Sequence, residues 1–102
     1  MDAHRGQIQA MERAAAAVSF GAGERPADCT TLSRDTSAVA NALPTPDDLL
    51  TKYLDGAVSW YGAAAAYCGA GGYKAQADLG LASGFERNAE LRAVTLGTPV
   101  WR

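Results

Sequence analysis

Apolar residues recur every three or four positions along most of the chain, which is the spacing of one face of an α-helix. Four segments show this pattern, and glycine or proline residues separate them. We predict helices over residues 3–20, 28–43, 46–69 and 73–96. The expected inner faces of the first three helices are Ile8, Met11, Ala15 and Val18; Cys29, Leu32, Thr36, Val39 and Leu43; and Leu50, Leu54, Ala57, Tyr61, Ala64 and Cys68.

The boundaries of these segments follow from residues that stop or start a helix. Gly21-Ala22-Gly23 ends the first helix, and Pro44 ends the second because proline blocks a backbone hydrogen bond. The third segment has the clearest start, with Thr45 as the expected N-cap and Pro46 as the first helical residue. The two aspartates that follow then face the positive end of the helix dipole.

The fourth segment is less regular than the others. Leu81, Phe85, Leu91 and Val94 share a broad apolar side, and we expect this side to face the core. Short connections favour antiparallel neighbours, and a chain of 102 residues is long enough to bury one core. The sequence therefore predicts a single all-α domain over residues 1–102, an up-down antiparallel bundle of about four helices.

Charge and composition argue against several classes of function. The formal net charge is −2, and acidic and basic residues are interspersed. A nucleic-acid interface or a polybasic membrane contact needs clustered lysine and arginine, which this pattern does not provide. The longest apolar stretch, around residues 60–70, is too short for a transmembrane helix. The first residues show no signal peptide, so we expect either a cytosolic protein or an exported one whose signal has been removed.

Two cysteines, Cys29 and Cys68, fall on the predicted inner faces of neighbouring helices. Two readings are open: buried thiols in a cytosolic protein, or one disulfide in an exported protein. We favour the disulfide, although a straight antiparallel hairpin leaves the two residues about two helical turns apart. Extended backbone before Thr31, a bend at Gly56 or Gly62, or pairing between chains would remove this mismatch, and we favour the extended backbone.

Three aromatic residues, Tyr53, Trp60 and Tyr67, recur every seventh position along one flank of the third helix. They either pack in the core, which is the favoured interpretation, or line a groove for a partner helix or an apolar ligand. Trp101, close to the C-terminus, is similarly either a packing residue or an exposed contact. These four residues are the candidate binding residues of the chain.

The residue pattern does not favour catalysis or metal binding. His4 is the only histidine and has no second ligand at helical spacing, so neither a metal site nor a Cys–His nucleophile is expected. The start of a helix already explains Asp47 and Asp48, which otherwise form a carboxylate pair. A phosphate-binding loop is not expected at residues 69–72, because this glycine-rich stretch follows a helix and has no lysine. We expect a solvated charged face at Glu86, Arg87, Glu90 and Arg92. The sequence therefore predicts no catalytic residue, no metal and no cofactor.

The string Trp60-Tyr61-Gly62 resembles the Trp-x-Gly signature of small helical proteins that are exported by type VII secretion. In that family the signature lies in the turn between two long helices, whereas here it lies inside a predicted helix. The family's export signal, a tyrosine followed by an acidic residue four positions later, has no counterpart in this chain. The resemblance implies a helical partner protein that acts as a dimer.

A second resemblance covers residues 28–68. A cysteine early in one helix, a Pro-Asp-Asp helix start, a stretch of aromatic residues and alanines, and a second cysteine resemble small exported or lipid-anchored helical domains of high-GC actinobacteria. This resemblance implies a secreted, periplasmic or cell-envelope location. Such domains mostly have no assigned activity, so the resemblance points to a location and not to a reaction.

Together these observations predict a non-enzymatic binding or structural module that works outside the cytoplasm, with a cytosolic location left open. The expected partner is another protein or a second copy of the chain, and neither nucleic acid nor a membrane-spanning segment is expected. Two alternatives stay open. One is a dimeric partner protein like those of type VII secretion, and the other is a small ligand carrier that uses an aromatic groove.

Overall fold

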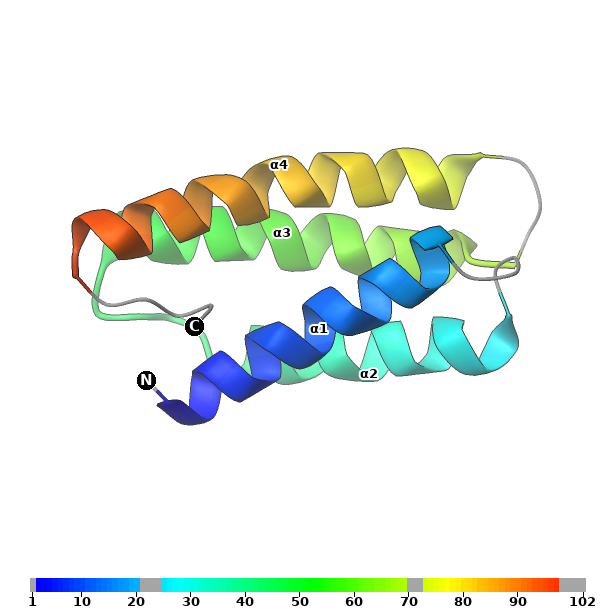
Figure 1. Cartoon of the computed structure of the whole chain (residues 1–102), viewed down its shortest axis with the longest axis horizontal. Coiled ribbons are helices and arrows are strands. Elements are labelled where there is room, and N and C mark those ends of the chain that lie inside the picture. Colours follow the sequence, from blue (N-terminus) through cyan, green and yellow to red (C-terminus); the bar gives the residue numbers. More distant parts are fainter. Residues whose placement is uncertain (1, 21–24, 70–72, 98–102) are drawn as a thin grey trace.

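The computed structural model describes residues 2–20, 25–69 and 73–97, and these residues form four α-helices (Figure 1). The helices are α1 (Asp2–Phe20), α2 (Pro26–Asn41), α3 (Asp48–Tyr67) and α4 (Lys74–Thr95). Successive helices run in opposite directions along the bundle (Figure 1). The predicted all-α up-down architecture is confirmed, and each helix begins and ends within two residues of its predicted position.

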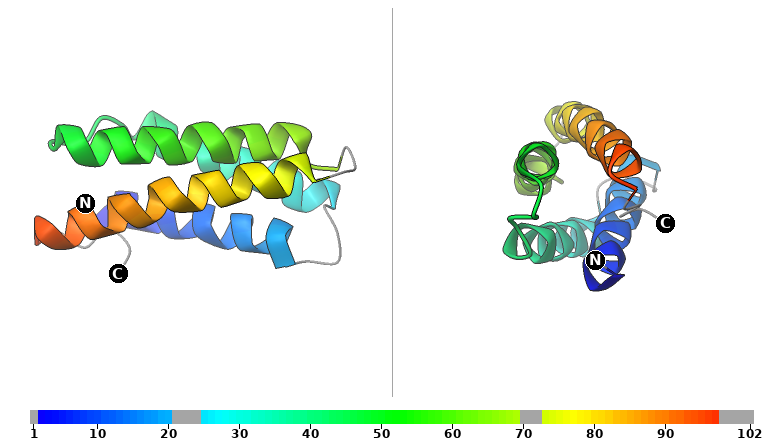
Figure 2. Two further views of the ribbon diagram at one scale, coloured as in Figure 1. Left: turned by 90° about the horizontal axis from the view of Figure 1, so that it is seen from above. Right: turned by 90° about the vertical axis from the view of Figure 1, so that its left-hand side faces the viewer.

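The four helices are not packed equally tightly. Seen along the long axis, α3 and α4 lie on one side of the bundle and α1 and α2 on the other (Figure 2). The α3–α4 interface is the most extensive, α1 packs on α2, and α2 packs on α3, whereas α1 and α4 meet along a short stretch only. The reason is visible in Figure 1, where α1 runs obliquely to the other helices and its N-terminal half diverges from α4.

The core consists mainly of small and medium-sized side chains. Met11, Val18, Leu32 and Leu54 are among the largest side chains that are fully buried, and alanines fill much of the remaining interior. Small side chains let neighbouring helices approach closely while the interior stays densely packed. The predicted inner faces of α1, α2 and α3 are confirmed, with the two cysteines and Leu43 only partly buried at the ends of their faces.

The inner face of α4 differs from the predicted one. Leu81, Leu91 and Val94 are half exposed, with 49%, 57% and 51% of their surface accessible to solvent. The residues that α4 buries are Ala75, Asp78, Leu79, Ala82, Ala89 and Ala93. The mostly small side chains of this face allow close packing on α3, and the larger apolar residues are turned outward. Of the predicted set only Phe85 packs against the core, where its ring lies over Gly56 of α3.

The start of α3 also differs from the prediction, because the N-cap is Asp47 and not Thr45. The Asp47 carboxylate accepts a hydrogen bond from the backbone N–H of Leu50 at 2.8 Å. The Thr45 hydroxyl donates to the backbone carbonyl of Asp47 at 2.7 Å and lies 2.8 Å from the Thr51 hydroxyl, so it braces the turn before the helix. Aspartate caps a helix as well as threonine does, and its charge adds a favourable interaction with the helix dipole.

Candidate functional site

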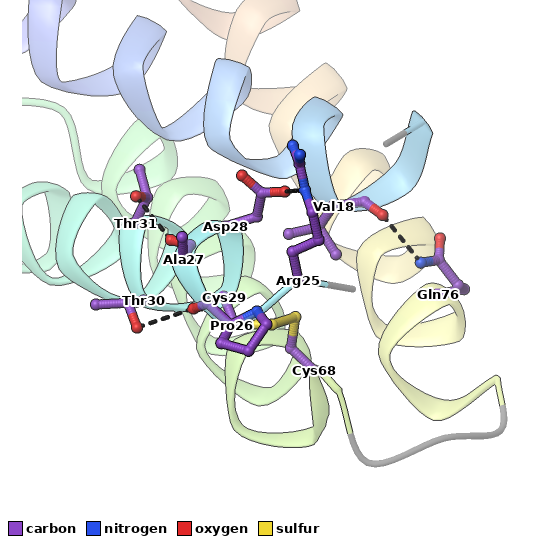
Figure 3. The surroundings of a disulfide bond; sticks show 10 residues. All are labelled: Val18, Arg25, Pro26, Ala27, Asp28, Cys29, Thr30, Thr31, Cys68 and Gln76. Atoms are coloured by element: carbon purple, nitrogen blue, oxygen red, sulfur yellow. Dashed lines mark hydrogen bonds and ion pairs between the residues drawn. A yellow bond between two sulfur atoms is a disulfide. The ribbon is translucent and has the colours of Figure 1, made fainter. Parts of the chain in front are cut away.

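Cys29 and Cys68 form a disulfide within the chain, with their Cα atoms 5.7 Å apart (Figure 3). Cys29 lies in the first turn of α2, and Cys68 directly follows the last residue of α3. The Cα separation is within the range that a disulfide requires. The bond therefore joins two antiparallel neighbours at one end of the bundle, as we expected from the sequence.

The two cysteines meet by a different route from the predicted one. α2 is helical from Pro26, so the backbone between Pro26 and Thr31 is not extended. The helical stretch from each cysteine to the far end of its helix is roughly 18 Å on α2 and roughly 30 Å on α3. The connection at residues 42–47 supplies the difference, because six extended residues span up to about 20 Å. In Figure 1 this connection continues past the end of α2 before it reaches the start of α3.

The disulfide end of the bundle also connects α1 to α4. The side-chain amide of Gln76 on α4 donates a hydrogen bond to the backbone carbonyl of Val18 on α1 at 3.3 Å (Figure 3). Beside it, the ion pair between Arg25 and Asp28, at 2.9 Å, brings the residue before α2 against the first turn of that helix. At this end, therefore, a bond links α2 to α3 and a hydrogen bond links α1 to α4.

The aromatic flank of α3 lies beside α4. Tyr53 and Trp60 are partly buried and pack against the core, whereas Tyr67 is 48% exposed. The ammonium group of Lys74 lies 5.9 Å from the centroid of the Trp60 ring and 5.0 Å from that of the Tyr67 ring. Lys74 also pairs with the buried carboxylate of Asp78 at 2.8 Å. A cation of the protein itself therefore occupies the aromatic surface near Trp60 and Tyr67.

Tyr53 lines an open groove at the other end of the bundle, where α3 begins and α4 ends. The groove, which we call the end groove, has a volume of about 290 Å³ and is lined by Leu49, Tyr53, Asn88, Leu91, Arg92 and Thr95. Leu49 is 39% exposed and Leu91 is 57% exposed. Val94, three residues after Leu91, is another exposed apolar residue of the same helix end. The remaining candidate binding residue, Trp101, lies outside the described residues.

A bidentate ion pair between Arg92 and Asp47 joins the two helices of the end groove. Arg92 donates from Nε to Oδ2 of Asp47 at 2.9 Å and from Nη2 to Oδ1 at 2.8 Å. The hydrogen bonds from Arg92, and after them the one from the backbone of Leu50, lower the pKa of Asp47 to about 2. Because Arg92 lines the groove, this pairing fixes one of its walls. The expectation that Arg92 belongs to a solvated charged face is therefore wrong.

We expect Asp47→Asn to weaken the dependence of stability on pH below about pH 4, because asparagine keeps the N-cap and loses the charge. Folding lowers the pKa of Asp47 from 3.8 to about 2. Its stabilising contribution is therefore present above pH 3.8 and is lost as the pH falls through 2. Thermal unfolding followed by circular dichroism between about pH 2 and pH 5 measures the effect. Asp55→Asn, at an exposed site on α3, is the control, and indistinguishable curves for the two variants would contradict the prediction.

A polar cluster between α1, α3 and α4 was missed by the sequence analysis. The hydroxyl of Tyr61, a residue only 2% exposed, donates to Oε2 of Glu86 at 2.5 Å. The carboxyl group of Glu12 on α1 is hydrogen bonded to Glu86 as well. The three residues line a groove of about 230 Å³ together with Ala15, Ala16, Ser19, Leu79 and Ser83.

The carboxyl group of Glu12 keeps its proton at neutral pH. Burial and the neighbouring Glu86 raise the pKa of Glu12 from 4.5 to about 8. Burial also raises the pKa of Glu86, against the opposing effect of the hydrogen bonds from Tyr61 and Glu12. Two carboxyl groups form a hydrogen bond only when one of them is protonated, so Glu12 is the donor at neutral pH. Burial and Glu86 likewise raise the pKa of Tyr61, which keeps its hydroxyl protonated.

One signal in the sequence points to this cluster. Glu12 lies four residues after Ile8 and three before Ala15, so it falls at the edge of the inner face of α1. Glu86 lies four residues after Ala82 and three before Ala89, which α4 buries. The spacing alone therefore places Glu12 beside the core, whereas it places Glu86 there only once the buried alanines of α4 are known, and only the packing of α1 on α4 brings the two glutamates together.

Other functional classes receive no support from the described residues. Within the described ranges, no group of three or more histidine, cysteine, aspartate or glutamate side chains is placed to hold a metal ion. In the same ranges, no helix combines the length and the apolar character that a bilayer crossing requires. Trp60-Tyr61-Gly62 lies inside α3 and not in a turn.

Comparison with known proteins gives no match to a protein family, to a curated protein or to a solved structure. The fold alone does not decide a function, because helical bundles host many unrelated activities. The function therefore has to be inferred from the exposed surface, the disulfide and the chemistry of the grooves.

Proposed function

We propose that the protein is a non-enzymatic module that binds another protein outside the cytoplasm. The observation that carries this proposal is the apolar surface of the end groove, where Leu49 and Leu91 are exposed on opposite walls. Val94, three residues after Leu91 on α4, is a further exposed apolar side chain. Clusters of exposed apolar side chains with polar residues at their rim are typical of protein interaction sites.

The shape of the end groove favours a protein over a small molecule. It is an open depression between two helices, and an amphipathic helix with apolar residues every three or four positions fits such a surface. Asn88 and Arg92 stand at its rim and provide hydrogen-bond donors to a partner. The aromatic surface that a ligand carrier would use is already covered in part by Lys74.

The disulfide supports the location. Disulfides persist in oxidising compartments and are rare in the cytosol, where thiols are kept reduced. A bond that joins α2 to α3 at their ends is the kind of cross-link that stabilises a small exported domain with a thin, alanine-rich core. The resemblance of residues 28–68 to exported helical domains of actinobacteria agrees with a secreted, periplasmic or cell-envelope location.

A matched pair of leucine substitutions tests the binding surface. Leu91→Asp places a charge in the end groove. Leu81→Asp places the same charge at a similarly exposed leucine of α4 that does not line the groove. A photo-crosslinking residue at position 91 should trap the partner in the cells that make the protein, and one at position 81 should not. We then expect Leu91→Asp to weaken binding of that partner by about tenfold or more, with Leu81→Asp close to wild type.

Circular dichroism of both variants confirms that each remains helical. Equal binding by the two variants, or no adduct specific to position 91, would contradict the proposed surface. An adduct between two copies of the chain would show that the partner is a second copy, as in the dimeric alternative.

A further inference from the structure

A hydrogen-bonded pair of carboxyl groups crosses the interface between α1 and α4. Glu12 belongs to α1, and Glu86 belongs to α4 and also accepts the hydroxyl of Tyr61 from α3 at 2.5 Å. With one proton between them, the two carboxyl groups attract each other. Without it, two carboxylates in a partly buried site repel each other, because water screens their charges poorly there.

The pair lies in the contact between α1 and α4, which is much less extensive than the contacts between successive helices. The hydrogen bond from Gln76 to Val18 joins the two helices at the disulfide end. Glu12 lies six residues before Val18, roughly 9 Å along the helix, and the N-terminal half of α1 diverges from α4 (Figure 1). Because these helices meet along a short stretch only, the carboxyl pair adds a polar interaction to a small contact.

The other charges around the pair add, on balance, to the negative charge at this site. The charged and titratable neighbours of Glu12 are Arg13 on its own helix, Tyr61 of α3, and Glu86 and Glu90 of α4. On the far side of α1, Arg34 and Asp35 of α2 line a groove together with Arg13. Glu90 adds negative charge, and Arg13 opposes it with a smaller effect. Loss of the shared proton therefore leaves an excess of negative charge on this side of α1.

We propose that Glu12, Tyr61 and Glu86 form a proton-operated latch that holds α1 against α4 and releases it as the pH rises above neutrality. In the closed state Glu12 donates to Glu86, and Tyr61 holds Glu86 in place. When the proton leaves, α1 separates from α4, and the groove lined by Ala15, Ala16 and Leu79 widens. The disulfide keeps α2 and α3 joined during this movement.

The direction of the pH effect follows from linkage. Glu12 has a pKa of about 8 in the closed state and one nearer its ordinary 4.5 when α1 has separated and water reaches it. The closed state therefore binds the proton more tightly, is fully favoured at acidic pH, and loses that advantage as the pH rises from about 4.5 to about 8.

Two measurements on the oxidised full-length protein test the latch. Carbon-detected NMR of the glutamate carboxyl groups should show Glu12 titrating well above 4.5. Hydrogen exchange of α1 amides, taken relative to α3 amides of the same sample, should become at least about tenfold faster between pH 6 and pH 9. The internal comparison removes the intrinsic dependence of exchange on pH.

Glu12→Gln tests the role of the proton, because its amide donates to Glu86 at every pH. We expect this variant to lose the alkaline acceleration of α1 exchange, whereas Asp55→Asn, which removes the same charge from an exposed site, should keep it. The latch is overturned if the acceleration persists in Glu12→Gln, if Glu12 titrates near 4.5, or if α1 stays protected after Glu12 has titrated. Should Glu12→Gln fail to fold, the two wild-type measurements decide the matter alone.

Discussion

Replacing Cys29 and Cys68 by serine should lower the free energy of unfolding by about 4 kcal/mol. The two cysteines are 39 residues apart, and the disulfide restricts the unfolded chain by closing this long loop. Small domains unfold with a total free energy of about 5–15 kcal/mol, so the loss would be a large share of the stability. The thin core of this bundle makes the effect more visible, because alanines supply much of the buried surface.

Urea unfolding at equilibrium measures this loss for the oxidised wild type, the reduced wild type and the double variant. The reduced wild type and the double serine variant should have similar midpoints, well below that of the oxidised protein. Cys29→Ala combined with Cys68→Ala controls for the polarity of serine in a partly buried site. Equal midpoints for oxidised and reduced wild type would show that the bond does not stabilise the fold.

Gly56→Ala should destabilise the protein by about 1–3 kcal/mol, because a side chain at this position overfills the interface between α3 and α4. A Cβ atom there would overlap the ring of Phe85 from α4. Gly62 lies on the same helix with open space around it. Gly62→Ala should therefore stabilise the protein by up to about 1 kcal/mol, since alanine is the better helix former.

The comparison of the two glycines separates packing from helix propensity. Thermal and urea unfolding of both variants give the two free energies, and Phe85→Leu provides a second background with a smaller side chain over Gly56. In that background Gly56→Ala should cost less than in the wild type, as expected for residues in direct contact. Similar changes for Gly56→Ala and Gly62→Ala would mean that Phe85 does not limit the space at position 56.

The inner faces of three helices could be predicted because their large apolar residues repeat at helical spacing and are buried. Leu32, Leu50 and Leu54 are examples, each with at most 2% of its surface exposed. The same reasoning failed for α4, where Leu91 is exposed and Ala89 is completely buried. A search for helical periodicity gives most importance to large apolar residues, whereas a close interface between helices is built from small ones. The sequence alone therefore predicted the wrong side of α4 as its buried face.

The interactions between helices were the part of the site that sequence reasoning could not supply. Glu86 and Arg92 looked like members of one charged, solvated face, yet Glu86 joins the cluster with Tyr61 and Arg92 pairs with Asp47. Their partners are 25 and 45 residues away along the chain. Helical spacing predicts which side of a helix a residue occupies, but only the angle between packed helices decides which charges meet.

The disulfide has a consequence for the topology of the molecule. It closes residues 29–68 into a covalent ring that contains most of α2, the connection at residues 42–47 and the whole of α3. α1 precedes this ring in the chain and α4 follows it, and both are attached to it at the same end of the bundle. α1 and α4 are therefore both attached to one end of a covalent ring, and they can separate at their far ends without breaking any bond of that ring.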